Sequence, residues 1–551
     1  MIQYLRTIVM RYRDFLYACI GGVLLGIGFI VPSLWFFSLF SFFPFLLSVM
    51  RERASASRIF SLGLVFGFIA YGLSFSPNFW GIFPLTWLGI NNLLVEVLGV
   101  GFIWSSTVLV FALCSGLYAL VFRLVMTNSW FDIFLASSGW ILADWLGAWL
   151  FSLVNAGSAT LYGSHFTIGS FGYLLADDIA LLQVSWLGGL FALNGLVVVV
   201  GVLLFRILRA RDKKEKLVLI FVAVGGFVLW SGGHVLLYSV PSEARATGEA
   251  ITITAVSTRT PVQLTPDDDE LAARYQRIAK LVGSIDDADL VLLPEATGLL
   301  EWLRSTHGSL TDLLSPQLKG KTGGPLFVDS AVVRGADGVL RSRVEYRNAG
   351  TWQSSFAYKE FPSPFGEALP YLYYWFAEKV IHNKEFTNTL EERRLAKGVR
   401  PSLIAIGGTQ VSALLCSDGI SPLIYREHVR DGADILANIS SQAWFQGSYQ
   451  MEKISKRIAS VRAAETRRWL VYAGNMAPSF VVDPYGRLVK ETERDTESVL
   501  QIEAYPRQDM TPFTIFGEWV LVFPFLTIVA TALFRGLSWR DFSRRLHISR
   551  I

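Results

Sequence analysis

The stretch VSALLCSDGIS (residues 411–421) combines an apolar run, typical of a buried strand, with a cysteine at its end and an aspartate two residues later. Taken alone, a cysteine after an apolar run is more often a core residue than a reactive one. The tip of a buried strand is also where a nucleophile can be held above the edge of a sheet. The local pattern leaves both interpretations of Cys416 open, so the rest of the sequence has to decide between them.

The sequence around this stretch alternates short β-type runs with amphipathic helical segments. Strands are predicted at residues 250–256, 288–296, 433–440 and 469–475, and helices at 267–285 and 448–468. Such alternation predicts an α/β layered domain in which helices cover a sheet. Chemistry in such sheets gathers beyond the strand ends. Glu295, Lys359 and Cys416 all stand at predicted strand ends.

The composition indicates a second, membrane-embedded part. Hydrophobic residues make up 52% of the 551-residue chain and charged residues 17%, with a mean hydropathy of +0.42. These values are too apolar for an ordinary soluble protein. We therefore predict a membrane domain with seven transmembrane helices over residues 1–244, a catalytic α/β domain over 245–508, and a last transmembrane helix with a basic tail over 509–551.

Charge and cysteine content narrow the range of partners. The net charge of +4 does not indicate a nucleic-acid partner, because the basic residues cluster beside apolar segments. Cys19 and Cys114 lie in apolar segments and Cys416 stands alone in the α/β domain, so no disulfide framework is expected there. No His or Cys cluster has the spacing of metal ligands. We expect neither a metal nor a cofactor.

Eight segments have the length and apolarity of spanning helices. They cover residues 14–31, 33–50, 59–76, 98–124, 130–152, 184–206, 217–239 and 513–535. Lys and Arg flank alternate loops, whereas the loops at 77–97 and 153–183 contain neither. Because basic loops stay in the cytoplasm, both termini are predicted to be cytoplasmic and the α/β domain extracytoplasmic.

A few polar or unusually aromatic features stand out in the membrane part. Asp132, His234 and Glu518 lie near segment ends, where interfacial placement is the simpler interpretation, but Asp144 is central and is a functional candidate. The aromatic loop SPNFWGIFPLTWLGINN (residues 76–92) is expected at the outer interface. It is also a candidate for a lipid-facing wall beneath the α/β domain.

Glutamate, lysine and cysteine together form a workable set for acyl transfer. A thiolate attacks a carbonyl, a carboxylate takes the thiol proton, and a lysine stabilises the oxyanion. Taken singly, each residue has a simpler structural interpretation: a core cysteine, a helix-capping glutamate and a solvated lysine. Local spacing alone does not select them.

The order of three motifs carries a family resemblance. LPEA (293–296), YKEFPSPFGE (358–367) and CSDGIS (416–421) resemble the nitrilase superfamily with its Glu, Lys and Cys triad. With seven spans before this domain and one after it, the chain resembles the apolipoprotein N-acyltransferases. Further matching motifs are QAWF (442–445), RAAETRR (462–468), NMAPSFVVDPYGRL (475–488) and TPFTIFGEW (511–519).

The resemblance implies an αββα layered sandwich and a role for each motif residue. Glu295 would be the general base, Lys359 the oxyanion stabiliser and Cys416 the nucleophile. Glu367 would be a second active-site carboxylate, and the backbone N–H of Ser417 would complete the oxyanion hole. The remaining residues expected to line the pocket are Asp418, Trp444 and Phe445.

The resemblance also implies a reaction and its partners. Cys416 would take an acyl chain from a phospholipid, most often phosphatidylethanolamine, as a thioester. The α-amine of a diacylglyceryl-cysteine lipoprotein would then accept the chain, with membrane lipids surrounding the enzyme. The expected location is the bacterial cytoplasmic (inner) membrane.

Several positions depart from the family pattern. VSTRTPVQ (256–263) stands where GNIPQ is usual, SSQAWF (440–445) where SNDAWF is usual, and Ser417 and Asp418 replace an aromatic residue and a glutamate. Gly147 stands where an arginine is common. The alternatives are a membrane-tethered nitrilase-type amidase, an acyltransferase with another amine acceptor, and a non-catalytic scaffold. Residues 369–380 are expected to form either a membrane-dipping lid or a core helix.

Overall fold

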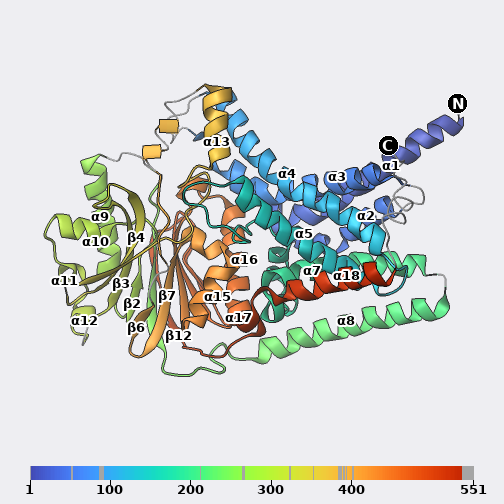
Figure 1. Cartoon of the computed structure of the whole chain (residues 1–551). Helices are drawn as coiled ribbons and strands as arrows, with labels where there is room; N and C mark the ends of the chain where they lie inside the picture. Colours follow the sequence, from blue (N-terminus) through green and yellow to red (C-terminus); the bar gives the residue numbers. More distant parts are fainter. Residues whose placement is uncertain are drawn as a thin grey trace.

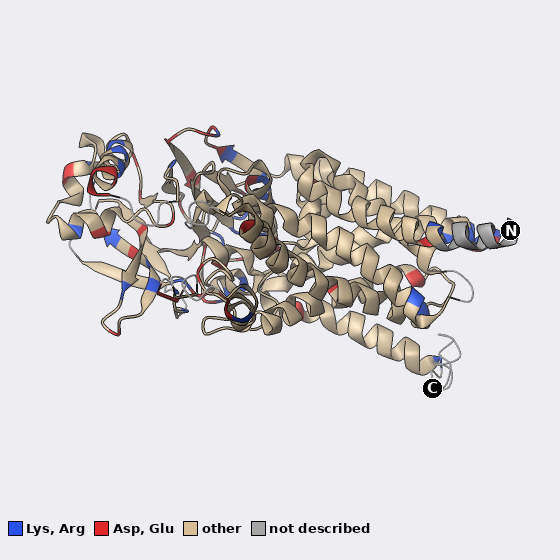
Figure 2. Ribbon diagram, turned by 90° about the horizontal axis from the view of Figure 1, so that it is seen from above, with Lys and Arg blue, Asp and Glu red and all other residues tan. Residues whose placement is uncertain are grey.

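The computed structural model describes residues 2–50, 54–85, 92–210, 212–262, 267–321, 324–351, 353–382, 387–388, 391–392, 394–399 and 403–535, with side chains from residue 12 onward except at residue 381. A bundle of long helices forms one end of the molecule and a β-sandwich the other (Figure 1). Lys, Arg, Asp and Glu are frequent in the sandwich and at the far tips of the helices and sparse along the bundle between them (Figure 2).

Seven helices in the described part of the chain are long and apolar enough to cross a membrane, by length and composition. They correspond to the first seven predicted spans and form the elements α1 (Ile2–Ile30), η1 with α2 (Pro32–Phe40, Phe42–Val49), α3 (Ala56–Phe79), α4 (Leu93–Val125), α5 (Asp132–Val154), α7 (Ser185–Arg209) and α8 (Lys213–Ser239). The predicted eighth span is divided. The short helix α17 (Pro512–Phe516) ends at Gly517, whose φ is +63°, and the shorter apolar helix Glu518–Phe534 follows, containing α18 (Val522–Phe534). The predicted basic tail from residue 536 lies outside the described residues.

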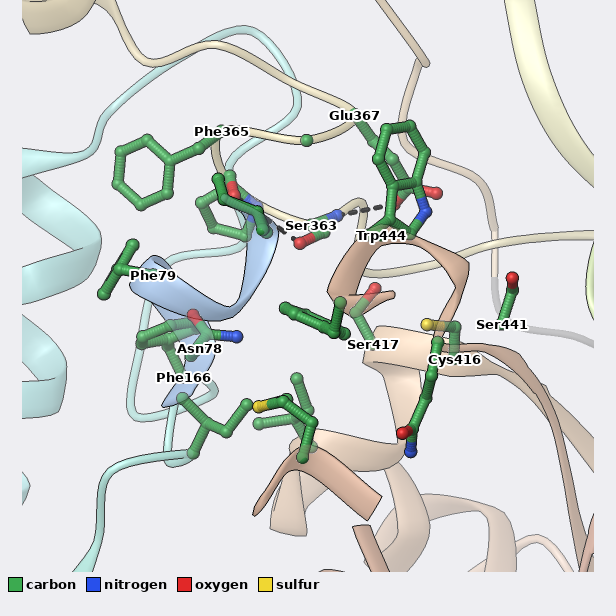
Figure 3. A pocket seen from close by; sticks show the side chains of 18 of the residues that line it. Asn78, Phe79, Phe166, Ser363, Phe365, Glu367, Cys416, Ser417, Ser441 and Trp444 are labelled. Atoms are coloured by element: carbon green, nitrogen blue, oxygen red, sulfur yellow. Dashed lines mark hydrogen bonds between the residues drawn. The ribbon is translucent and has the colours of Figure 1, made fainter. Parts of the chain in front are cut away.

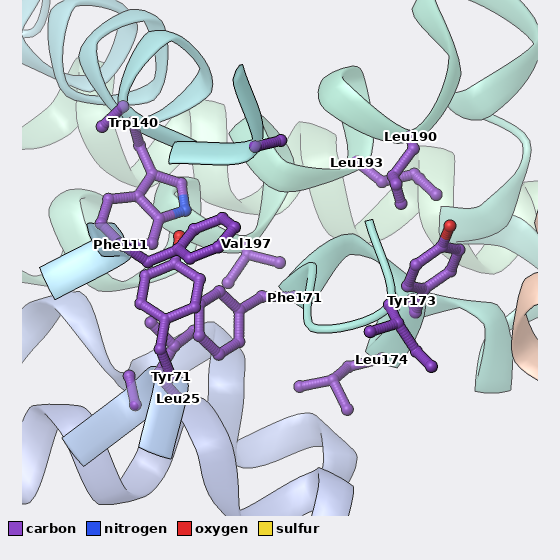
Figure 4. Packing of buried hydrophobic residues seen from close by; sticks show 14 of the residues in the cluster. Leu25, Tyr71, Phe111, Trp140, Phe171, Tyr173, Leu174, Leu190, Leu193 and Val197 are labelled. Carbon is purple, nitrogen blue, oxygen red and sulfur yellow. The ribbon is translucent and has the colours of Figure 1, made fainter. Parts of the chain in front are cut away.

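Asp144 is buried beside Tyr71, whose ring packs against Phe111 and Trp140 in the aromatic core of the bundle (Figure 4). The Tyr71 hydroxyl donates to Asp144 Oδ1 at 2.6 Å, and Asn194 Nδ2 donates to Oδ2 at 2.6 Å. Ser170 Oγ donates to the same Oδ2 at 3.0 Å. These bonds satisfy the buried carboxylate, so the residue singled out in the sequence ties α3, α5 and α7 to the segment after residue 170.

Two six-stranded sheets, counted over the described residues, form the sandwich. The first has the order β12 (Ser498–Ala504), β1 (Ile251–Ser257), β2 (Leu290–Leu292), β3 (Leu326–Arg334), β4 (Leu340–Asn348), β5 (Ser354–Tyr358). The second has the order β11 (Leu488–Glu491), β10 (Phe480–Val482), β9 (Trp469–Asn475), β8 (Ile435–Ser441), β7 (Thr409–Leu415), β6 (Ile404–Ile406). Their inner faces share one apolar core that includes Ile253, Leu290, Val411 and Val471.

Helices cover the outer face of each sheet, which confirms the αββα sandwich. The helix α9 (Asp268–Gly283) packs on the first sheet through Ile278 and Val282, in a separate apolar cluster with Val291 and Phe327. On the second sheet, α15 (Pro422–Arg430) and α16 (Tyr449–Thr466) share a single apolar core with the membrane helices. The layer of α15 and α16 therefore lies between the sandwich and the bundle (Figure 1).

Arg457 on α16 is the main polar link across this layer. Its side chain is 2% exposed and donates to the carbonyl oxygens of Gly28 at 2.8 Å and Pro32 at 3.1 Å. The guanidinium also pairs with Asp177 Oδ2 at 2.5 Å. Asp177 ends the short helix η4 (Phe171–Asp177) of the membrane part. A single buried cation thus holds three points of the bundle against the sandwich.

Replacing this cation by an apolar side chain of similar length should weaken the joint. Among the described residues, Arg457→Met leaves Asp177 with Lys453 as its remaining cation, whose Nζ is 3.5 Å from Oδ1, and should lower the free energy of unfolding by about 3 kcal/mol. The measurement is an unfolding titration in detergent micelles.

Arg494→Met is the matched control, because Arg494 is 43% exposed and pairs with Glu452 at 3.1 Å. It should lower the free energy of unfolding by less than about 1 kcal/mol. Equal losses in the two variants would contradict the assignment of a structural role to Arg457.

Candidate active site

Three strand ends bring Glu295, Lys359 and Cys416 together. Glu295 follows β2, Lys359 follows β5 and Cys416 follows β7. Lys359 Nζ donates to Glu295 Oε1 at 2.9 Å, and the Glu295 carboxyl lies beside the Cys416 thiol, close enough for the charge of each to act on the other. All three side chains line one cavity. The arrangement has an acid–base group and a cation beside a thiol, as nucleophilic acyl chemistry requires.

Lys359 is a buried ammonium held between two carboxylates. Its side chain is 2% exposed, and Nζ also donates to Glu367 Oε1 at 2.7 Å. Burial lowers the pKa of Lys359, but the charges of Glu295 and Glu367 outweigh burial and hold this pKa well above its usual value. The lysine therefore stays cationic at neutral pH and is available to stabilise a developing oxyanion.

Glu295 and the thiol both have raised pKa values. Burial raises the pKa of Glu295, and the nearby charge of Glu367 adds to the effect while Lys359 opposes it. Burial and the charge of Glu295 raise the pKa of the Cys416 thiol to about 12. The thiol is therefore protonated at neutral pH and needs a proton acceptor in contact with it. Glu295 is in that position.

Cys416, the candidate nucleophile, stands on a strained turn. Cys416 begins the 3-10 turn η6 (Cys416–Ile420) with a φ of +40°. A non-glycine residue in this left-handed region costs about 1–3 kcal/mol and persists only where its surroundings hold it. Strain of this kind is found at functional sites. The geometry thus favours the reactive interpretation of Cys416 over the core one.

Glu367 is held in place by a tight turn. Its Oε2 accepts the backbone N–H of Ser363 at 2.7 Å, the contact drawn in Figure 3. Its other oxygen accepts from Lys359. The turn therefore aims Glu367 at the lysine, and Glu367 in turn fixes where the ammonium lies. Glu367 can act through Lys359 as well as on a substrate in the cavity.

Ser417 and Asp418 lie on different sides of the nucleophile turn. Ser417 lines the cavity, and its hydroxyl donates to the carbonyl oxygen of Phe361 at 2.6 Å. Asp418 was expected to line the pocket, but its side chain is fully buried and is not among the cavity-lining residues. Its carboxylate accepts the backbone N–H groups of Phe361 at 2.7 Å and Leu415 at 3.3 Å. The short Asp418 side chain reaches both amides and fixes the turn on the side that does not line the cavity.

The cavity joins the polar site to an apolar wall. It has a volume of about 490 Å³, within the usual range for small-molecule sites. Trp444 and Phe445, on the turn η7 (Ala443–Phe445), line it as expected from the sequence. The opposite wall comes from the membrane part (Figure 3) and consists largely of Phe79, Ile82, Leu85, Val100, Phe102, Ile103 and Phe166.

The sequence pointed to part of this wall. The aromatic loop that lacks Lys and Arg does supply Asn78, Phe79, Ile82 and Leu85, although its residues 86–91 lie outside the described residues. Phe166 and Ile168 also line the cavity, and the sequence marked their loop only by its lack of Lys and Arg.

Residues 369–380, expected as either a membrane-dipping lid or a core helix, pack against the membrane helix α4 rather than within the sandwich, and their role as a lid stays a prediction. They contain α13 (Tyr371–Phe376) and the start of a π-helical turn, Ala377–Ile381. The Phe376 ring stacks on Phe102 with centroids 3.7 Å apart, and the Tyr373 hydroxyl is 2.7 Å from Ser106 Oγ. Tyr371 and Trp375 are more than half exposed. The segment covers the end of α4 and closes one side of the cavity.

Comparisons with known proteins agree with this architecture. Residues 372–511, which include Cys416, match the carbon-nitrogen hydrolase family. An apolipoprotein N-acyltransferase of Geobacter metallireducens is 26% identical over 96% of this chain and 96% of its own length. Those of Rickettsia typhi and Gloeobacter violaceus are 21% identical (96% of this chain, 98% of theirs) and 26% identical (91% of this chain, 89% of theirs). These matches run through both the helical bundle and the sandwich. The chain is thus similar along most of its length to the apolipoprotein N-acyltransferases, contains a carbon-nitrogen hydrolase domain, and fits a divergent, membrane-embedded member of that family.

Proposed function

We propose that the protein moves a fatty acyl chain from a phospholipid, through a thioester on Cys416, to the α-amine of the diacylglyceryl-cysteine of a lipoprotein. The observation that carries this proposal is the single cavity in which Glu295, Lys359 and Cys416 face an apolar wall built by membrane helices. A water-soluble amide substrate would have no use for that wall. The names of the full-length relatives support the same reaction.

The first half-reaction acylates the thiol. Glu295 takes the proton of Cys416, and Sγ attacks the ester carbonyl of the phospholipid. The resulting oxyanion is stabilised by the Lys359 ammonium and, in this proposal, by the backbone N–H of Ser417. The carbon–oxygen bond to glycerol then breaks. The proton on Glu295 passes to the leaving alkoxide, which departs as a lysophospholipid, and the acyl chain stays on sulfur.

The second half-reaction transfers the chain to an amine. The neutral α-amine of the lipoprotein cysteine attacks the thioester carbonyl, Glu295 takes a proton from the attacking nitrogen, and the carbon–sulfur bond breaks. The proton on Glu295 returns to the thiolate. An amide forms at the expense of an ester and no further energy source is needed, since the thioester keeps the acyl group activated between the two halves.

The placement of the site supports an extracytoplasmic reaction at the bacterial inner membrane. The loops that lack Lys and Arg lie at the catalytic end of the bundle, where Thr167 contacts Ile420 and Gln446 contacts Ile82. The ion pair Arg58–Asp14 and the cluster of Arg206 belong to the segments between the other helix ends. By the positive-inside rule, the catalytic half would face away from the cytoplasm. Phosphatidylethanolamine is the proposed donor.

Acylation with labelled phosphatidylethanolamine in nanodiscs tests the proposed function. The wild-type protein should form one hydroxylamine-sensitive acyl adduct per chain, Cys416→Ala should form none, and the matched variant Cys19→Ala should form it like the wild type. The adduct should pass to a diacylglyceryl-cysteine peptide. Failure to pass it on would favour another amine acceptor, hydrolysis of small amides without an adduct would favour an amidase, and no chemistry at all would favour a scaffold.

The pH dependence of thioester formation tests the role of Glu295. A base must be ionised, and burial raises the pKa of this carboxyl above its ordinary value of 4.5. The rate should therefore fall as the pH drops through a value above 4.5. Because the pKa of Lys359 is raised, deprotonation of the lysine should not lower the rate below about pH 10.

Glu295→Gln is the variant for this measurement. It should lower the rate at neutral pH by about 10²- to 10⁴-fold and abolish the decline on the acid side. An unchanged acid decline in Glu295→Gln would assign that decline to another group and remove Glu295 from the mechanism.

A further inference from the structure

The strained nucleophile turn is held from three sides within the sandwich. Leu415, just before Cys416, is paired with Ile439 of β8. The Asp418 carboxylate clasps Leu415 and Phe361, and the Ser417 hydroxyl bonds to Phe361. These contacts fix the beginning of the turn. At the other end, the Ser421 N–H donates to the Asp418 carbonyl oxygen at 3.2 Å and Ser421 Oγ caps α15 through the N–H of Ile424, so the question is what else holds Ile420 and Ser421.

The membrane part holds that other end. Thr167 Oγ1 donates to the carbonyl oxygen of Ile420 at 2.8 Å, and His165 Nδ1 is 2.8 Å from Ser421 Oγ. Burial, together with the charge of Lys397, lowers the pKa of His165 to about 4, so this histidine is neutral at pH 7. Thr167 is 4% exposed. The contact is thus a buried hydrogen bond between residues that are 253 positions apart in the sequence.

The direction of donation around Thr167 is determined by its single hydroxyl proton. This proton goes to the Ile420 carbonyl, which can only accept, so the Tyr173 hydroxyl, 2.7 Å away, must donate to Thr167 Oγ1. Tyr173 in turn accepts from Arg462 Nη2 at 2.6 Å, and a guanidinium can only donate. A one-way chain of donors therefore runs from Arg462 on α16 through the membrane part to the nucleophile turn.

The same loop also shapes the cavity. The residues on either side of Thr167, Phe166 and Ile168, both line it, and Figure 3 shows Phe166 on the side opposite Cys416. Tyr173 and Arg462 are fully buried, and Figure 4 places Tyr173 beside Leu190 and Leu193 of α7. The loop is therefore fixed to the bundle, to α16 and to the nucleophile turn at once.

We propose that residues 163–170 of the membrane part are a positioning element for the nucleophile, and that Thr167 is its positioning residue. Thr167 holds the far end of the Cys416–Ile420 turn, so that Sγ stays in contact with Glu295. This inference refines the proposed function, on which it rests for the identity of the acyl donor, but the placement of the thiol can be measured without any donor. Without the hydrogen bond from Thr167 to Ile420, the Cys416 thiol would lose its alignment with Glu295.

Alkylation of Cys416 by iodoacetamide across a pH series, followed by peptide mass spectrometry, measures the placement of the thiol directly. In the wild type, contact with Glu295 should allow alkylation near neutral pH. In Thr167→Val the thiol should lose its proton acceptor, so that alkylation at neutral pH slows about tenfold or more and recovers only at higher pH. Thr167→Ser keeps the hydroxyl and should restore most of the wild-type profile.

Single-turnover thioester formation from labelled phosphatidylethanolamine gives the second readout. Thr167→Val should lower the maximal rate about tenfold or more while the phospholipid concentration for half-maximal rate stays the same, because the apolar wall is intact. Tyr173→Phe, which removes the donor to Thr167 but keeps the ring, should change both readouts in the same direction. It is the substitute if Thr167→Val does not fold.

Thr531→Val is the matched control, since its hydroxyl donates to Thr527 at 2.7 Å within α18. It should leave both readouts unchanged. The proposal is overturned if Thr167→Val matches the wild type, if Thr167→Ser is as slow as Thr167→Val, or if Thr531→Val has the same effect. If the wild type forms no thioester but the alkylation profiles still separate Thr167→Val from Thr167→Ser, the acyl-donor assignment is wrong and the positioning role of Thr167 is supported.

Discussion

The buried ammonium of Lys359 is the interaction on which the site depends. A charge removed from water is tolerated only when it is paired and hydrogen-bonded, and Glu295 and Glu367 meet that condition from two different segments. Three strand ends must therefore meet at one point. The two carboxylates also have different surroundings. Glu295 lies beside the Cys416 thiol, whereas Glu367 is fixed by the backbone N–H of Ser363.

A second set of buried charges fixes the position of the membrane part relative to the site around Lys359. Arg457 and Arg462 on α16 both reach η4, through Asp177 and Tyr173. Asp144 and Asn194 hold the start of the same segment in the bundle. Because η4 is fixed on both sides, the apolar wall of Phe79 and Phe102 faces Cys416 across one cavity. An apolar joint of equal area would resist sliding less, since apolar contacts lack direction.

Much of this could be predicted from the sequence, and the misses have physical causes. The meeting of Glu295, Lys359 and Cys416 was predictable because each stands at a predicted strand end and the order of their motifs resembles the nitrilase superfamily, although local spacing alone did not select them. The buried orientation of Asp418 was not, since it depends on how a 3-10 turn places a side chain two residues after a strand. Thr167 and His165 lie in a loop that the sequence marked only by its lack of Lys and Arg, and only the docking of α16 on the bundle brings them to Cys416. The last span was expected in one piece, but the backbone turns at Gly517.

We propose above all that a membrane lipid reaches Cys416 through the apolar wall of the bundle. The most direct measurement is a structure of the acyl-enzyme, prepared with phospholipid and without a lipoprotein acceptor. We expect an acyl chain joined to Cys416 Sγ that runs along Phe79, Val100 and Phe102. A chain that leaves the thiol toward the solvent side of the sandwich, away from these three residues, would contradict it.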